Sequence, residues 1–165
     1  MQQNQSVTPE SGAFRILVAG TDLQFHDFQV TDPVPTARQI IEATGGRPAD
    51  EFIVLEWLKD GDLEELELDE TTDLRAPRAE RFIVSRSSEL FKFEIDGKRH
   101  SWPDKTITRE ALLAIAQQDP AKFSVWQEFQ KKPDEEVLAG HPAHLEPEGV
   151  ERFYTVMKHT TEGVQ

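Results

Sequence analysis

The sequence predicts an α+β protein made of two tandem copies of one small domain, and two observations lead to this prediction. Five short blocks recur in the same order along the 165 residues, at an offset of 77 residues for the first block and of 71 or 72 residues for the others. In each copy, runs that alternate apolar and polar residues, as strands do, surround one run with the apolar spacing of a helix. Five ordered matches are too many for chance, so we interpret the chain as a duplicated domain.

The recurring blocks extend from the first predicted strand of each copy to the last. The pairs are FRILVAG (14–20) with FKFEIDG (91–97), PTARQIIEA (35–43) with ITREALLAIA (107–116), EFIVLEW (51–57) with KFSVWQEF (122–129), EEL (64–66) with EEV (135–137), and ERFIV (80–84) with ERFYTV (151–156). The order of the structural elements is therefore expected to be the same in both copies.

Each copy begins with a predicted β-hairpin. Apolar and polar residues alternate in 91–95, and the same period of two is present in 14–18. Asp96 and Gly97 offer the positive backbone φ angles that a two-residue hairpin turn requires, and residues 19–22 take this part in the first copy. We expect the return strands over residues 23–30 and 98–102.

One helix follows the hairpin in each copy. Thr36 is a suitable N-cap with Gln39 three residues later, and Thr108 caps the second helix. The pair Gly45 and Gly46 is expected to end the first helix as a C-cap, and Asp119–Pro120 to end the second. The apolar stripes that would face the core are Ala37, Ile40 and Ile41 in the first helix and Ala111, Leu112, Ile115 and Ala116 in the second.

Two later strands complete each copy, at 52–58 and 81–86 in the first and at 123–129 and 152–158 in the second. A hairpin, one helix across one sheet face and late strands that complete a mixed sheet describe a β-grasp domain with a two-layer core. The expected domains are residues 13–86 and 87–158. A disordered leader at 1–12 is expected before them and a flexible tail at 159–165 after them.

Composition excludes several classes of function. There are 31 Asp and Glu against 18 Lys and Arg, a net charge of −13, which repels nucleic acid and anionic lipid. The absence of cysteine excludes disulfides and thiolate sites and is in keeping with a reducing compartment. Without an apolar run of about 18 residues or a signal-peptide pattern, the protein is expected to be soluble and cytoplasmic.

The second copy carries a pattern that resembles the bacterial multi-ubiquitin domain. The segments that show it are WPDKTITREALLAIA (102–116), FSVWQEF (123–129) and LEPEGVERFYTV (145–156), and the first copy resembles the family through PTARQIIEATGG (35–46), LELDETTDL (66–74) and ERFIVSR (80–86). Two ubiquitin-like domains with a short tail are similar to the modifier protein of bacterial ubiquitination-like operons. The same layout is similar to the interferon-induced two-domain ubiquitin-like modifier of vertebrates.

The resemblance implies a ubiquitin-like protein modifier rather than an enzyme. Operons of this kind encode an E1-like activating enzyme, an E2-like conjugating enzyme and a JAB-type metalloprotease beside the modifier, and act in defence against phage. The partners implied are these three enzymes and lysines of target proteins, phage structural proteins among them. ATP and zinc would belong to the partner enzymes, so no cofactor or metal is expected in this chain.

On this interpretation the reactive group is the backbone carboxylate of Gly163. A conjugated terminus must be glycine because a Cβ would crowd the adenylate and the thioester carbon. Cleavage after Gly163 would remove Val164 and Gln165 and leave a tail that threads the channel of an enzyme, namely His159, Thr160, Thr161 and Glu162. Ubiquitin-type tails usually end in two glycines, whereas here Glu162 precedes Gly163. The alternative is that Gly163 falls in a frayed terminus without a role.

Other residues could indicate a site, but their context favours a structural role. His26, His141, His144 and His159 lack the number of ligands that a zinc site needs, and we expect them to be solvated. The acidic runs 60–70 and 134–136 are not accompanied by a base or an oxyanion donor. We therefore expect them to form solvated loops rather than catalytic carboxylates. The three tryptophans, Trp57, Trp102 and Trp126, are expected in the core or at a domain contact.

A function of a different class is also open. Tandem β-grasp domains can serve as docking or adaptor modules that bind a partner through a sheet face or edge and are never conjugated. Loss of the last seven residues would abolish the function of a modifier and leave that of a docking module. The tail therefore discriminates between the two hypotheses.

Overall fold

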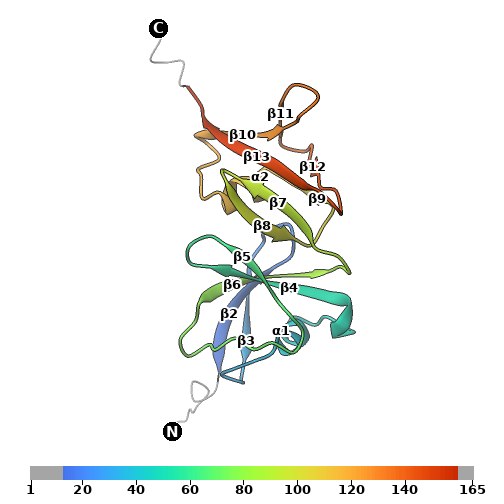
Figure 1. Cartoon of the computed structure of the whole chain (residues 1–165). Helices are drawn as coiled ribbons and strands as arrows, with labels where there is room; N and C mark the ends of the chain where they lie inside the picture. The colour runs from blue at the N-terminus through green and yellow to red at the C-terminus, as the bar shows by residue number, and fades with distance from the viewer. Residues whose placement is uncertain (1–12, 160–165) are drawn as a thin grey trace. The chain divides into compact units, whose positions relative to one another are not determined.

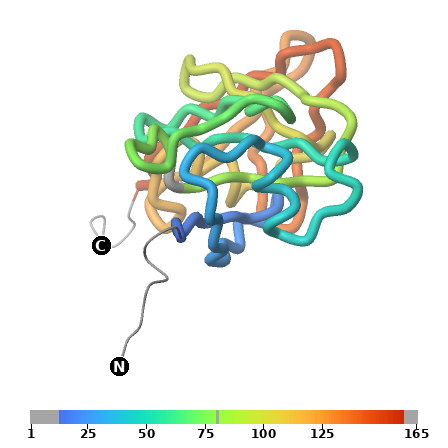
Figure 2. Tube along the Cα trace, turned by 90° about the horizontal axis from the view of Figure 1, so that it is seen from below, coloured from blue at the N-terminus to red at the C-terminus, as the bar shows by residue number. Residues whose placement is uncertain are grey.

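The computed structural model describes residues 13–159, apart from the side chain of Glu80. The chain divides into two compact units, Met1–Ser88 and Glu89–Gln165, which we call the N-terminal and the C-terminal unit. Each unit has a five-stranded sheet and one α-helix (Figure 1), and Figure 2 traces the backbone through the connections. Neither α-helix in residues 13–159 is long and apolar enough to cross a membrane.

The N-terminal unit has strand order β3-β2-β6-β4-β5. Strands β2 and β6 run parallel, and the other neighbours are antiparallel. The elements are β2 (Phe14–Ala19), β3 (His26–Val30), α1 (Ala37–Ala43), the 3-10 helix η2 (Ala49–Glu51), β4 (Phe52–Leu58), β5 (Leu63–Leu66) and β6 (Ala79–Arg86).

The C-terminal unit has the equivalent order, β8-β7-β13-β10-β11, with β7 and β13 parallel. A separate two-stranded ladder joins β9 to β12. The elements are β7 (Phe91–Ile95), β8 (Lys98–Trp102), β9 (Thr106–Ile107), α2 (Arg109–Ile115), β10 (Phe123–Glu128), β11 (Glu135–Glu136), β12 (Ala143–His144) and β13 (Val150–Met157). The expected fold class, two tandem β-grasp domains, is confirmed.

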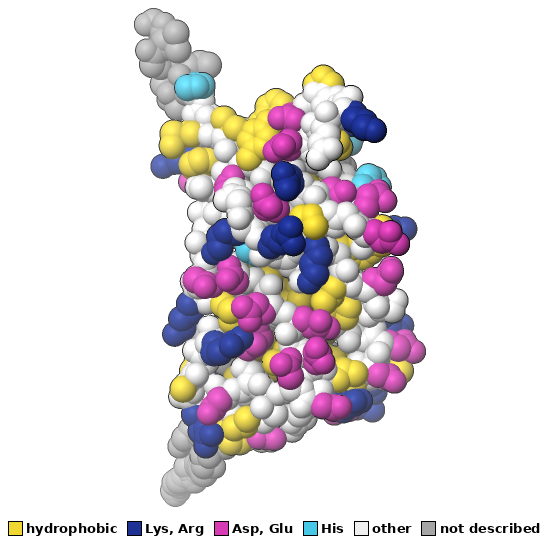
Figure 3. All heavy atoms as spheres, viewed as in Figure 1, with side chains coloured by type: hydrophobic (Ala, Val, Ile, Leu, Met, Phe, Trp, Pro, Cys, Tyr) yellow, Lys and Arg dark blue, Asp and Glu magenta, His cyan; other side chains and the backbone are white. Residues whose placement is uncertain are grey.

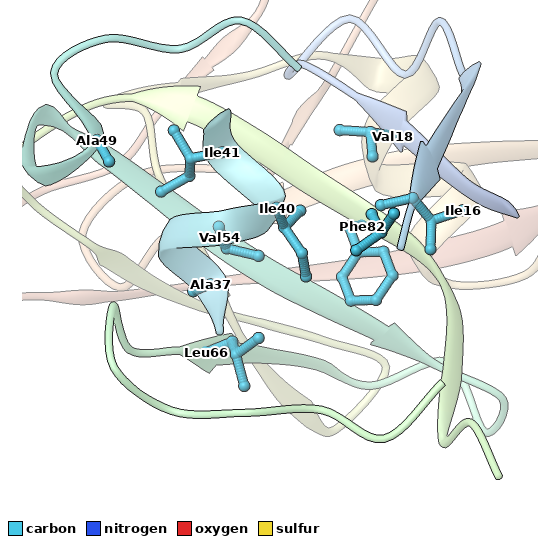
Figure 4. Close-up of a cluster of buried hydrophobic side chains, with 10 residues drawn as sticks. Ile16, Val18, Ala37, Ile40, Ile41, Ala49, Val54, Leu66 and Phe82 are labelled. Atoms are coloured by element: carbon cyan, nitrogen blue, oxygen red, sulfur yellow. The ribbon is translucent and has the colours of Figure 1, made fainter. Parts of the chain in front are cut away.

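The core of the N-terminal unit lies between α1 and one face of the sheet (Figure 4). Helical spacing places Ala37, Ile40 and Ile41 on one side of α1, and all three are fully buried. They pack against apolar residues that alternate along the strands, including Ile16, Val18, Val54, Leu66 and Phe82. Burying these side chains is the main favourable contribution to folding.

The C-terminal unit is built in the same way and adds a tryptophan. Trp102, at the end of β8, is 1% exposed, and its indole N–H donates to the carbonyl of Thr106 at 3.0 Å. This bond braces the segment that leads into α2. Trp57 is also buried, while Trp126 is half-buried and donates to Ser124 Oγ at 3.0 Å.

Both ends of α1 are capped by the residues that the sequence predicts. Thr36 Oγ1 accepts from the N–H of Gln39 at 3.2 Å, and the Gln39 side chain accepts from the N–H of Thr36 at 2.8 Å. At the other end Gly45 has φ +89°, and the N–H of Gly46 bonds to the carbonyl of Ile41 at 3.0 Å. The expected capping box and glycine C-cap are therefore both present.

The second helix ends earlier than the sequence predicts. Asp119–Pro120 was expected to terminate it, but α2 stops at Ile115 and Gln117 adopts a left-handed φ of 60°. The N–H of Gln118 then bonds back to the carbonyl of Leu113 at 2.9 Å. This closure satisfies the last carbonyls of the helix, so a non-glycine residue takes the place that Gly45 has in α1.

The two hairpins also differ. Asp96 and Gly97 have φ of 50° and 84°, as the two-residue turn requires. In the first copy the return strand begins at His26 instead of Leu23. Leu23 has φ 60° and donates to the carbonyl of Gly20 at 3.1 Å, so a separate turn forms before the strands pair.

Candidate functional site

The predicted tail follows the central strand of the C-terminal unit. Strand β13 lies between β7 and β10, and Phe123 is the register partner of Met157. The next backbone bond runs from the N–H of Lys158 to the carbonyl of Lys122 at 2.8 Å. The described chain then ends at His159, which is exposed. The tail therefore continues from the central strand, whose last residues are held by β10.

The other tail residues singled out in the sequence lie outside the described residues. They are Thr160, Thr161, Glu162, Gly163, Val164 and Gln165. The structure defines the strand that carries them, and the conjugation site at Gly163 stays a prediction.

Exposed apolar side chains occur where the described chain ends. Val156 is 41% and Met157 64% exposed, and they are two of the three large apolar residues exposed in residues 13–159, with Leu138 as the third. Hydrophobic side chains gather on the visible face of the C-terminal unit near this end (Figure 3). As consecutive residues of a strand, Val156 and Met157 expose apolar area on opposite faces of the sheet, and exposed apolar area is surface on which a partner can dock.

One side of this region is held by a short hydrogen bond. The Tyr154 hydroxyl donates to Asp134 Oδ2 at 2.6 Å, and Asp134 Oδ1 accepts from the N–H of Phe129 at 3.2 Å. The bond to the Asp134 carboxylate raises the pKa of Tyr154, as do partial burial and the nearby charge of Glu128. Asp134 thus anchors the loop after β10 to β13, which is a structural role.

The structure places the histidines that the sequence singled out on the surface. His26, His141, His144 and His159 are all exposed. No group of three or more His, Asp or Glu side chains within residues 13–159 is arranged to hold a metal ion. The fifth histidine, which the sequence analysis passed over, is His100. It is buried on β8 with its ring 5.4 Å from Phe93, and its position two residues before Trp102, on the same face of the strand, is the signal that could have indicated its burial.

The acidic part of the N-terminal unit contains one buried carboxylate that the sequence analysis missed. Glu56 on β4 is 3% exposed and accepts from Thr72 Oγ1 at 2.8 Å and from Arg78 Nη2 at 3.2 Å. Arg78 also contacts Glu64 at 3.1 Å. Both oxygens of Glu56 are therefore engaged in holding the segment before β6 against β4. This arrangement gives Glu56 a structural role.

Comparison with known proteins bears on both units. The family model described as Multiubiquitin matches residues 15–87 and again residues 91–158, so one match falls on each unit. No curated protein matches the chain. The two matches cover most of the 165 residues and coincide with two units of the same strand order. The chain belongs to the Multiubiquitin family.

Proposed function

We propose that this protein is a ubiquitin-like modifier that is joined to amines of other proteins through the carboxylate of Gly163. The observation that carries the proposal is the position of HTTEGVQ (159–165), directly after the central strand of a ubiquitin-like unit. Membership of the Multiubiquitin family supports it. So does the resemblance of the chain to the modifiers of bacterial ubiquitination-like operons.

The length of the tail suits this role. Five residues, 159–163, span about 17 Å when extended at roughly 3.3 Å per residue. This reach brings a terminal carboxylate into a deep active site while the folded unit stays outside. Met157, the more exposed of the two apolar residues at the end of β13, provides apolar area for the docking of that enzyme.

The proposed chemistry has three steps, each carried out by a partner enzyme. A JAB-type zinc peptidase hydrolyses the amide between Gly163 and Val164 and releases the last two residues. An E1-like enzyme uses ATP to form an acyl adenylate with release of pyrophosphate; its cysteine thiolate then displaces AMP to give a thioester, and the acyl group passes to the cysteine of an E2-like enzyme. A lysine amine of the target, a phage structural protein in the proposed cytoplasmic defence, attacks the thioester and forms an isopeptide bond.

The first test is the mass of the processed chain. Incubation with the JAB-type peptidase should remove Val164 and Gln165 and nothing else, as read by intact mass spectrometry. Gly163→Asp should block this cleavage. The added side chain would clash in the active site of the peptidase and at the adenylate, where only glycine fits. A cut at any other bond would contradict the assignment of Gly163.

The second test separates the modifier from the docking module. With the E1-like and E2-like enzymes and ATP, the whole chain should form covalent adducts that survive denaturation, and a chain that ends at Lys158 should form none. If the shortened chain binds the same partners with unchanged affinity and the whole chain forms no adduct, the docking function is the correct one.

A further inference from the structure

The two units differ sharply in the amines that they present. Residues 1–88 contain one lysine, Lys59, and seven arginines, whereas residues 89–165 contain seven lysines and three arginines. Both side chains carry a positive charge, but only a lysine amine can be acylated by a thioester, because the guanidinium group stays protonated and delocalised. The N-terminal unit therefore offers a single side-chain acceptor for the chemistry proposed above.

Five of the seven arginines of the N-terminal unit are engaged in ion pairs, and Lys59 is not. The pairs are Arg15 with Asp27, Arg38 with Asp69, Arg75 with Asp73, Arg78 with Glu56 and Glu64, and Arg86 with Glu51, at 3.0 to 3.5 Å. The Lys59 ammonium makes no hydrogen bond or ion pair with any residue in 13–159. The ion pairs described in this unit are therefore made by arginines, and the Lys59 amine is exposed without a partner in residues 13–159.

Lys59 lies at the tip of the hairpin between β4 and β5. Two backbone bonds close this turn, from the N–H of Leu58 to the carbonyl of Asp62 at 2.8 Å and from the N–H of Gly61 to the carbonyl of Leu58 at 2.9 Å. Gly61 has φ +97°, and the N–H of Asp62 donates to Asp60 Oδ1 at 3.0 Å. The exposed amine is therefore carried on a tip of fixed conformation, which lowers the entropic cost of its entry into an active site.

Several lysines of the C-terminal unit are less suitable as acceptors. Three amines already have partners: Lys92 with Ser101 Oγ at 2.8 Å, Lys132 with Glu135 at 3.2 Å, and Lys158 with the carbonyl of Pro120 at 3.4 Å. Lys122 pairs through its backbone with Lys158, beside the start of the tail. Once a modifier is attached to a target through its tail, Lys122 and Lys158 lie close to the point of attachment. Lys59 is on the unit that does not carry the tail.

We propose that Lys59 is the acceptor at which one copy of the modifier is joined to the next, an inference that rests on the proposed function. The neutral Lys59 amine attacks the carbonyl carbon of the Gly163 thioester held on the conjugating enzyme. A C–N bond forms, the C–S bond breaks, the cysteine thiolate leaves, and the amine proton passes to the thiolate or to solvent. The product is a chain in which each added copy is linked through Gly163 to Lys59 of the preceding copy.

The test uses the whole protein with the complete enzyme set and ATP, followed by tryptic mapping of the adducts. Trypsin cuts after Lys158, so each acceptor lysine retains the remnant HTTEG (159–163). Species that contain two or more modifiers should carry this remnant on Lys59. Lys59→Arg keeps the charge and should lose these species while attachment of single modifiers to the target remains.

Lys105→Arg is the matched control, because Lys105 is also exposed and its side chain has no partner in the described part of the chain. This variant should keep both kinds of product. The proposal is overturned if Lys59→Arg still forms multiple-modifier species at the native level, or if the remnant maps only to lysines of residues 89–165. It is also overturned if targets receive single modifiers and never a second one. The absence of every adduct would instead contradict the proposed function itself.

Discussion

The N-terminal and C-terminal units have the same strand order but differ where their last strands end. Register pairs Arg86 with Phe52 and Met157 with Phe123, so Arg86 and Met157 occupy equivalent positions. The Arg86 guanidinium donates to the carbonyl of Arg47 at 3.1 Å, pairs with Glu51 at 3.0 Å and lies 5.4 Å from the Phe52 ring centroid. Met157 is 64% exposed.

The backbone is the same at both ends, which locates the difference in the side chains. The N–H of Ser87 bonds to the carbonyl of Glu51 at 3.1 Å, and the N–H of Lys158 bonds to that of Lys122 at 2.8 Å. In the N-terminal unit the side chain therefore fixes the exit of the strand toward the next domain. In the C-terminal unit it leaves an apolar surface beside the tail. The two copies of the fold therefore differ in the side chains at the ends of their last strands, whereas their cores are built in the same way.

The largest expected effect tests whether the two cores are separate. Phe82 and Phe153 are equivalent, since Phe82 pairs with Val18 and Phe153 with Ile95 across the parallel strands, and both are buried. Each Phe→Ala change should destabilise its own unit by about 3–5 kcal/mol, through lost burial and the cavity that remains. Urea unfolding followed by hydrogen exchange of peptides from each unit measures this. If either change lowered the free energy of unfolding of both units equally, the two units would unfold as one.

A smaller effect should distinguish the two helices. Thr36→Ala breaks a reciprocal capping box, whereas Thr108→Ala removes a single bond to the N–H of Ala111 at 3.0 Å. We expect a cost of about 1–2 kcal/mol for Thr36→Ala and of about 1 kcal/mol for Thr108→Ala, measured by the same unfolding experiment. Thr→Ser at either position should keep most of the stability that Thr→Ala loses, because the serine hydroxyl can still cap the helix. A larger cost at Thr108 would contradict the ranking of the two caps.

The side chains at the two strand ends, Arg86 and Met157, should contribute little to stability. The Arg86 and Glu51 side chains are 61% and 55% exposed, so Arg86→Met should cost less than about 1 kcal/mol. Met157→Arg should change stability by less than about 0.5 kcal/mol but weaken binding of the activating enzyme, since it replaces apolar surface by charge. Thermal unfolding and a binding titration measure the two effects. If Met157→Arg left binding unchanged, the apolar surface would have no part in docking.

The smallest effect concerns pH. Tyr154 is the one tyrosine in the chain, so phenolate absorbance reports it alone. Its hydrogen bond to Asp134 raises its pKa above the usual 10.0, and the titration midpoint should lie above that value. Because the folded-state pKa is the higher one, the stabilising contribution is complete below pH 10.0 and is lost as pH rises through the folded-state pKa. Asp134→Asn should return the midpoint toward 10.0, and an unchanged midpoint would contradict this cause.

The candidate site could be predicted only in part. The tail and Gly163 were predicted from local chemistry and from a resemblance, and residues 160–165 lie outside the described part of the chain. The exposure of Val156 and Met157 was not predicted, because a run of apolar residues in a strand reads equally well as core. Both residues pair with β10, so only the packing of the folded unit decides that their side chains stay exposed.

The sequence by itself determined the duplication, the helix that crosses each sheet, the capping box at Thr36 and the turn at Asp96–Gly97. Each of these depends on residues a few positions apart, whose local geometry the chain specifies directly. Only the tertiary structure decided that β6 and β13 lie inside their sheets, and that Glu56 is buried against Thr72 and Arg78, 16 and 22 residues away. Such contacts join segments that are distant in sequence, so no local pattern can reveal them.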